Sequence, residues 1–204
     1  MLNTFLQIFF TVFIVIDPVG IVPLFISTTG RMSESEKRRT IWTAASVAFI
    51  VMSVFILAGR FILSFFGIAP GSFYIAGGVL FFLISVDMLF GQPKRTKTSK
   101  GEGEDSSSVA VFPLAIPMIS GPGTITTLML FSSDATSYLE VTLMLFGAIL
   151  ISLVAVVLAM FSSKYILKVL GKTGVSVVER IMGLILSGLA VQFVYNGLLK
   201  LGIL

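Results

Sequence analysis

Two short stretches of the chain place residues that can hold a ligand among residues that interrupt a helix. In residues 16–23, Asp17 is followed by Pro18 and Gly20 inside a long apolar run. A carboxylate is costly at membrane depth, and a proline removes a backbone donor and blocks the helix behind it. Residues 117–124 repeat the disruption about a hundred residues later, with two prolines, two glycines, a serine and a threonine.

Both stretches have the residue order that starts a helix. Asp is favoured at the N-cap and Pro at the first helical position, so we expect one half-helix to end near Val15 and another to begin at Pro18. In the second stretch, Ser120 or Gly121 takes the N-cap position and Pro122 the first helical position. Each restart leaves unpaired backbone N–H groups and the positive end of a helix dipole, which attract an anion or a carboxylate.

Together the two restarts predict a binding site for a small zwitterion such as an amino acid. The N–H groups of Gly123 and Thr124, with those near Gly20, would hold the carboxylate of the ligand. Asp17, or the carbonyls just before each interruption, would hold its ammonium. Glycines have no side chain, which lets a ligand approach the backbone closely. The substrate-binding residues that we predict are Asp17, Pro18, Gly20, Ser120, Gly121, Gly123 and Thr124.

Purely structural interpretations of these residues stay open. Pro and Gly are common in membrane helices, and a single kink is usually only structural. Asp17 has a local alternative as the N-cap of its half-helix. Thr124, Thr126 and Thr127 either line the cavity or bond to their own helix backbone. The ligand hypothesis is favoured because there are two interruptions at corresponding places in the chain.

The composition is typical of a membrane protein. Of the 204 residues, 56% are hydrophobic and only 12% are charged, whereas soluble domains have about 25% charged residues. The chain has no cysteine and no histidine, so disulfides are excluded and the commonest metal ligand is missing. No nucleotide-binding, nucleophile or metal-ligand pattern is present. We therefore expect no cofactor, no metal, no nucleic-acid partner and no enzymatic activity.

Long apolar runs predict an all-α fold with six membrane-spanning helices. The first is a retained span rather than a signal peptide, because residues 1–10 carry no Lys or Arg. The second starts with an exposed turn at Ser33 and Glu36, which have capping-box spacing. The approximate spans are residues 3–27, 33–66, 72–90, 109–131, 140–161 and 178–199.

Basic residues in the loops predict the orientation in the cytoplasmic (inner) membrane. Three loops carry most of the 14 Lys and Arg residues, and only Arg60 and Lys200 fall toward the other side. This alternation puts both termini outside. The last of these loops, residues 164–180, is a basic and partly amphipathic connector. The loop residues are Arg31, Lys37, Arg38, Arg39, Lys94, Arg95, Lys97, Lys100, Lys164, Lys168, Lys172 and Arg180.

The polar residues 91–108 predict a flexible cytoplasmic linker. This linker separates two three-helix repeats, residues 1–90 and 109–204. Because three is odd, the second repeat enters the membrane from the opposite side, and the two are inverted. At about 1.5 Å per residue, Asp17 lies roughly 20 Å into a hydrocarbon core about 30 Å thick. Helices 1 and 4 are therefore expected to be broken at mid-membrane, an arrangement typical of transporters.

The remaining polar residues within the spans have local explanations. Asp87, near the end of the third span, is more readily solvated or paired with Lys94 or Arg95 than buried. Gln192 and Asn196 in the sixth span are explained equally well by interhelical hydrogen bonds and by substrate contact.

Three motifs carry a resemblance to a known family: residues 17–25 (DPVGIVPLF), residues 113–125 (PLAIP and SGPGTI) and residues 180–184 (RIMGL). With them, essentially the whole chain except residues 94–108 resembles the MarC family, which includes the SnatA-type small neutral amino acid transporters. The resemblance implies a six-span inverted-repeat fold of the LysE superfamily kind. It also implies transport of glycine, alanine and similar amino acids, with proton coupling as an added hypothesis.

We therefore predict a secondary transporter of small neutral amino acids that works by alternating access. Its partners are a small zwitterionic amino acid, the lipid bilayer and a coupling ion, H+ or Na+. Without histidine, any proton coupling has to use a carboxylate, and Asp17 is the candidate. Two other classes stay open, a passive channel for small solutes and a non-transporting membrane assembly subunit.

Overall fold

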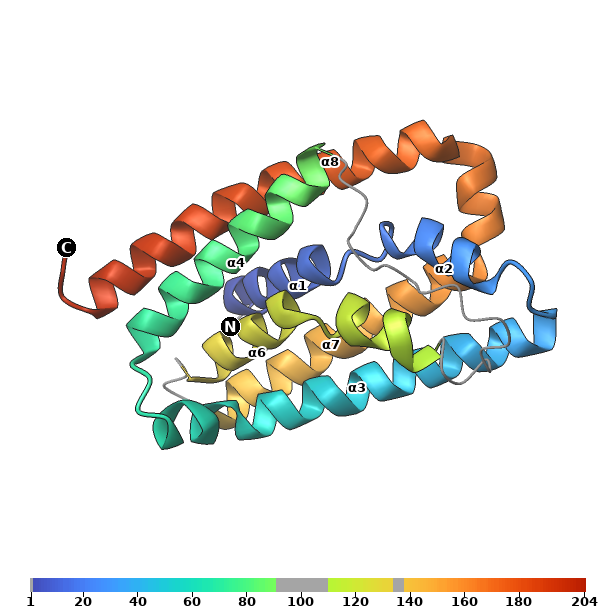
Figure 1. Ribbon diagram of the computed structural model, residues 1–204. Coiled ribbons are helices and arrows are strands. Elements are labelled where there is room, and N and C mark those ends of the chain that lie inside the picture. Colours follow the sequence, from blue (N-terminus) through green and yellow to red (C-terminus); the bar gives the residue numbers. More distant parts are fainter. Residues whose placement is uncertain (1, 91–109, 134–137) are drawn as a thin grey trace.

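Helices make up nearly all of the chain that the computed structural model describes, which is residues 2–90, 110–133 and 138–204 (Figure 1). No strand occurs among these residues, in agreement with the predicted all-α class. The predicted linker at 91–108 lies outside the described residues. The helices are α1 (Leu2–Ile16), α2 (Ile21–Thr29), α3 (Glu34–Phe65), α4 (Pro70–Phe90), η1 (Ala110–Ile119), α6 (Pro122–Ser133), α7 (Tyr138–Phe161) and α8 (Ser163–Lys200).

The lengths and apolar compositions of the helices are those of a multi-pass membrane protein. Within the described residues, five segments are long and apolar enough to cross a membrane: α1 with α2 (Leu2–Thr29), α3, α4, α7 and Thr173–Lys200 of α8. A sixth span results when η1 and α6, which are bent by 51° relative to each other, are counted as one. This count agrees with the six spans predicted from the sequence.

The predicted capping box starts α3. The Ser33 hydroxyl accepts a hydrogen bond from the Glu36 backbone N–H at 3.3 Å, and the Ser33 N–H donates to the Glu36 carboxylate at 2.7 Å. The two bonds satisfy backbone donors that the first helical turn leaves without partners. The exposed charged turn is therefore a regular helix start.

The predicted connector at 164–180 is helical, and it contains a sharp bend. Gly171 has φ 64° and ψ 179°, a conformation in which a residue with a side chain is strained. The bend separates the first turns of α8 from its membrane-spanning part, Thr173–Lys200. Figure 1 shows these first turns running at a steep angle to the rest of α8.

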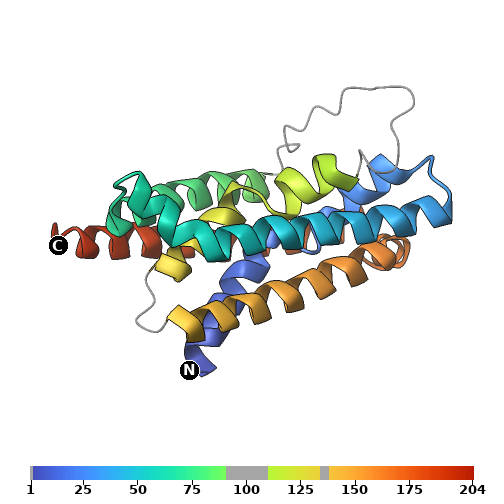
Figure 2. The same ribbon diagram turned by 90° about the horizontal axis from the view of Figure 1, so that it is seen from below.

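The closest helix pair is α4 with α8, which lie side by side along most of their length (Figures 1 and 2). The contacts show that the helices are antiparallel. A Cβ added at Gly71 would lie 2.9 Å from the Gly197 carbonyl oxygen, and one added at Gly78 would lie 2.7 Å from that of Ala190. Further along, a Cβ at Gly183 would lie 3.2 Å from the Ser85 carbonyl oxygen.

The small residues of this pair recur every seventh position on both helices. They are Gly71, Gly78 and Ser85 on α4 and Gly183, Ala190 and Gly197 on α8. A seven-residue repeat keeps one seam of each helix facing its partner, and small side chains let membrane helices approach until their backbones touch. Along this seam the α4 and α8 backbones therefore come into close contact.

The other helices pack around α1 and the interrupted segment η1–α6. α1 packs against α7, η1 packs against α3, and α6 packs against both α3 and α4. Aromatic rings fill the space between α4, α6 and α8, where the Phe193 ring lies 5.6 Å from Tyr74 and 5.0 Å from Phe81 between centroids. Together the two interrupted segments contact α3, α4, α7 and α8.

A single methyl group placed in the α4–α8 seam tests this packing. We expect Gly78→Ala to lower stability by about 1–3 kcal/mol, because the new Cβ would meet the Ala190 backbone oxygen and push the helices apart. The midpoint of thermal unfolding in detergent measures the effect. Gly188→Ala on α8, where an added Cβ meets nothing within 4 Å, is the matched control and should be neutral or slightly stabilising. Equal effects of the two substitutions would show that the seam is not tight.

Candidate functional site

The first interruption is centred on Asp17. α1 ends at Ile16, and Asp17 has φ 52°, an uncommon conformation for a residue with a side chain. Its own N–H still donates to the Phe13 carbonyl at 3.1 Å, and its carbonyl accepts from the Ile21 N–H at 3.3 Å. The chain therefore changes direction at one residue without losing these two backbone hydrogen bonds.

The Asp17 carboxylate caps the turn that follows. Its Oδ1 accepts a hydrogen bond from the Gly20 N–H at 3.0 Å, which is the contact of an N-cap side chain with the third residue of a helix. The prediction that Asp17 is the N-cap of a helix starting at Pro18 is wrong. The regular helix α2 begins at Ile21 with Gly20 as its N-cap and without a side-chain cap bond, because residues 18–20 form a turn between Asp17 and the helix.

Gly20 is required by the position of this carboxylate. A Cβ added there would lie 1.9 Å from Asp17 Oδ2 and 2.6 Å from its Cγ. Asp17 is itself only 5% exposed, so the carboxylate has little room to move aside. The carboxylate and the glycine backbone therefore form one packed unit.

The second interruption is longer and lies between η1 and α6. Phe112 and Ile116 have extended backbone conformations within η1, and Ser120 donates to the Ala115 carbonyl through both its N–H (2.9 Å) and its hydroxyl (2.8 Å). The Gly121 carbonyl then accepts from the Ile125 N–H at 2.9 Å. This bond makes Gly121 the residue before the helix and Pro122 its first residue, as predicted.

Hydroxyl groups complete the hydrogen bonding at the second interruption. The Thr124 hydroxyl donates back across the interruption to the Ile119 carbonyl at 3.0 Å. The Thr127 hydroxyl donates to the Gly123 carbonyl at 2.8 Å, which is the backbone alternative considered for the threonines. Thr126 packs its methyl group toward α4, since a Cβ added at Gly77 would lie 2.7 Å from it.

The two interruptions lie against each other. A Cβ added at Gly123, at the start of α6, would lie 3.1 Å from the side chain of Val15, two residues before Asp17. The same Cβ would lie 2.7 Å from Ile84 of α4, so three spans meet at this glycine. α2 also packs against η1. Figure 1 shows the end of α1 and the start of α6 together near the middle of the bundle.

All the predicted site residues are buried in this closed arrangement. Ser120 and Thr124 are each 1% exposed, and Pro18, Gly20, Gly121 and Gly123 are buried as well. Two hollows of the surface lie elsewhere, one beside Glu34 and Lys164 and the other beside Arg60 and Tyr138. Neither of these two hollows is lined by a predicted site residue.

The other polar residues of the spans lie apart from this junction. Asp87 is exposed, in line with the solvated alternative. Gln192 donates to Asn196 at 2.9 Å along α8, so this bond lies within one helix rather than between helices. The two amides are four residues apart, a spacing at which helical side chains meet.

Sequence reasoning missed two buried hydroxyls on α7. Thr142 and Ser152 are 8% and 0% exposed, and their oxygens have no hydrogen-bond partner among the described residues. The sequence carries little signal for them, because a Ser or Thr in an apolar helix commonly bonds to its own backbone. No group of three or more acidic, His or Cys residues that could hold a metal ion occurs in the described ranges.

The contact between Asp17 and Gly20 can be tested by one substitution. We expect Gly20→Ala to destabilise the protein strongly, by about 2 kcal/mol or more, because the new methyl group cannot coexist with the carboxylate in its present position. Thermal unfolding in detergent measures the change, with Gly147→Ala as the control, since its nearest contact is Phe5 at 3.4 Å. The double variant with Asp17→Ala should recover part of the loss. A Gly20→Ala protein as stable as wild type would contradict the observed packing.

Comparisons with known proteins agree with this architecture. The chain matches the family model described as MarC family integral membrane protein over residues 2–201. It is 37% identical to a UPF0056 membrane protein of Archaeoglobus fulgidus over 97% of this chain and 93% of that one. It is 35% identical to one of Pyrococcus horikoshii (97% and 95%) and 33% identical to one of Buchnera aphidicola subsp. Baizongia pistaciae (96% and 93%). No solved structure matches the chain. The match over nearly the whole sequence shows that the chain belongs to the MarC family of integral membrane proteins.

Proposed function

We propose that the protein is a secondary transporter of small neutral amino acids such as glycine and alanine, and that it works by alternating access. The observation that carries the proposal is the junction of two interrupted helices, where Val15 before Asp17 packs against Gly123 at the start of α6. Interrupted helices that meet inside a membrane protein are a common way to build a site for a charged solute.

The chemistry of the junction suits both ends of a zwitterion. The start of α6 presents the N–H groups of Gly123 and Thr124 and a positive helix end, which favour a carboxylate. The Asp17 carboxylate favours an ammonium group. In the closed form, local bonds from Gly20 to Asp17 and from Ser120 to Ala115 occupy some of these groups. A bound amino acid would exchange these bonds for its own.

An inverted repeat is the second part of the proposal. A shift of 105 positions, from Gly78 to Gly183, also takes Ser85 to Ala190. Gly78 approaches the Ala190 carbonyl, and Gly183 approaches the Ser85 carbonyl, so the shift exchanges the two contacts. A two-fold axis between antiparallel helices produces this kind of reciprocity.

The remaining helix contacts support the same symmetry. α1 of the first half packs against α7, and its counterpart η1 packs against α3, the counterpart of α7. Likewise α6 packs against α4, and α2 packs against α8. We therefore infer two inverted three-helix repeats, each of which wraps its interrupted span with helices of the other.

Membrane placement follows from lengths and charges. Fifteen residues of α1 extend about 22 Å, which puts Asp17 near or just past the middle of a hydrocarbon core about 30 Å thick. The start of α3 and the start of α8 are both basic and lie at the same end of the molecule, where Lys164 meets Glu34. This end would face the cytoplasm, with both termini outside the inner membrane.

Uptake into proteoliposomes tests transport and the role of Asp17. We expect labelled alanine to accumulate when a pH gradient is imposed, and Asp17→Asn to abolish that accumulation, because the amide cannot carry a proton. Asp87→Asn, which alters an exposed carboxylate at the end of α4, should transport normally. Accumulation unchanged in Asp17→Asn would remove Asp17 as the proton carrier.

The same vesicles distinguish the two alternative functions. Alanine flux without counterflow would indicate a channel. An assembly subunit would be favoured if no alanine flux occurred and titration with glycine or alanine gave no heat of binding.

The orientation can be tested with single cysteines, because the chain has none of its own. Ser35→Cys and Ser64→Cys lie near opposite ends of α3, and both positions are exposed. We expect a membrane-impermeant maleimide added to intact cells to label the cysteine at 64 and not the one at 35. Labelling of both positions after the membrane is opened is the control. The reverse pattern would overturn the proposed orientation.

A further inference from the structure

A basic hollow lies at the end of the molecule where α3 begins and α7 meets α8. It has a volume of about 60 Å³, several times the roughly 10–15 Å³ that one water molecule needs. Lys37, Arg38 and Lys164 provide its charged wall, and Phe25, Ile41 and Phe161 provide its apolar wall. The hollow therefore offers cations and an apolar surface within one small space.

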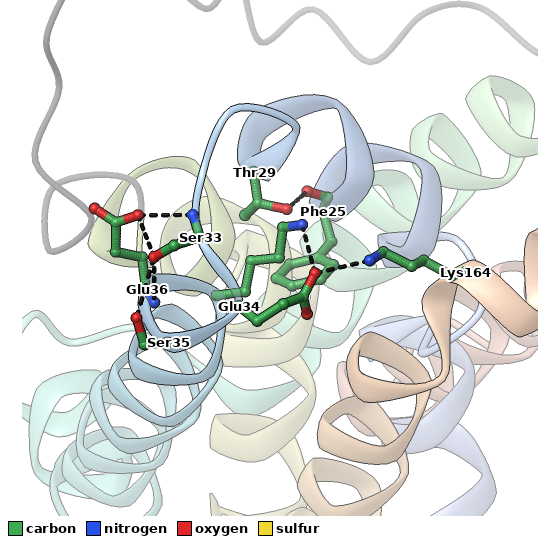
Figure 3. A network of polar contacts seen from close by, with 8 residues as sticks. Phe25, Thr29, Ser33, Glu34, Ser35, Glu36 and Lys164 are labelled. Carbon is green, nitrogen blue, oxygen red and sulfur yellow. Dashed lines mark hydrogen bonds and ion pairs between the residues drawn. The ribbon is translucent and has the colours of Figure 1, made fainter.

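The Glu34 carboxylate pairs with two of these cations, and Figure 3 shows its contact with Lys164. Oε1 of Glu34 accepts from the Lys164 ammonium at 2.7 Å and from the Lys37 ammonium at 3.2 Å. The Lys37 side chain is only 17% exposed, which is low for a lysine at a protein surface. Three cations against one carboxylate leave the hollow with an excess of positive charge, and each ammonium has further N–H donors beyond its bond to Glu34.

The surroundings of the hollow are those of a membrane–water interface. Trp42 is 58% exposed, and its ring lies 6.4 Å from that of Phe161, which lines the hollow. Exposed tryptophan is favoured at the level of lipid headgroups. The first turns of α8, set apart by the bend at Gly171, expose Tyr165 and Val169 beside Lys164. Such a short basic and apolar helix suits a position in the interface.

We propose that this hollow binds the phosphodiester headgroup of an anionic phospholipid. Arg38 and the free N–H donors of the two lysines hold the phosphate oxygens, and the glycerol and first acyl carbons lie on the apolar wall toward Trp42. The rule that basic loops face the cytoplasm accounts for the number of cations at this end. That rule does not explain why Lys37 is largely buried beside the apolar wall of the basic hollow. A bound lipid headgroup would explain it.

Thermal stabilisation of the purified full chain tests the proposal. In a zwitterionic detergent, we expect added phosphatidylglycerol to raise the unfolding midpoint, whereas phosphatidylcholine and inorganic phosphate leave it nearly unchanged. Each of Arg38→Gln and Lys164→Gln should raise the half-saturating concentration of phosphatidylglycerol about fivefold, the contribution of one interfacial cation. Arg60→Gln removes a cation near the other end of α3 and should leave it unchanged.

Glu34→Gln separates loss of charge from loss of the ion pairs. It breaks the ion pair that Lys164→Gln breaks, and the one with Lys37 as well, but it removes a negative charge instead of a positive one. We therefore expect phosphatidylglycerol to bind more tightly than to wild type. Weaker binding by Glu34→Gln would overturn the proposal. Equal stabilisation by phosphatidylcholine, equal stabilisation by inorganic phosphate, or an effect of Arg60→Gln as large as that of Arg38→Gln would also overturn it.

Discussion

In lipid, every backbone N–H and C=O group has to find a partner inside the protein, and the rest of this structure depends on that constraint. An uninterrupted helix meets it automatically, whereas an interrupted one needs side chains. At the first interruption a carboxylate accepts from an N–H, that of Gly20. At the second, the hydroxyls of Ser120 and Thr124 donate to carbonyls. The two solutions are chemically opposite, because an acceptor side chain closes the first interruption and donor hydroxyls close the second.

The long helices and the interrupted segments make different kinds of contact. α4 and α8 meet backbone to backbone along a regular seven-residue repeat, so a small displacement of either would create clashes at Gly78 or Gly183. The interrupted segments instead close on themselves through local side-chain bonds. Uninterrupted pairs of this kind suit a rigid frame, and the interrupted segments suit the moving part of a transporter.

Much of the fold could be predicted from local chemistry. The capping box at Ser33 and the helix start at Pro122 follow from rules that act over three or four residues. The left-handed conformation of Asp17 could not be predicted, because it depends on how α1 and α2 pack. The helix that packs against Gly78 could not be predicted either. A small residue indicates that another helix comes close, but it does not indicate which one. The bond between Gln192 and Asn196 could not be predicted either, because an amide that contacts its own helix looks the same in sequence as one that contacts another.

Helix α2 connects the candidate substrate site to the basic hollow. It begins just after the Asp17 turn, and Phe25, one turn further on, forms part of the apolar wall of the basic hollow. Five residues of helix between Gly20 and Phe25 correspond to about 7.5 Å, so the candidate substrate site and the hollow are separated by little more than one helical turn. Any opening of the first interruption that displaces α2 has to move Phe25 in the hollow. A lipid held there would favour the arrangement in which Phe25 keeps its place, and it would therefore bias the equilibrium between closed and open forms without touching the substrate.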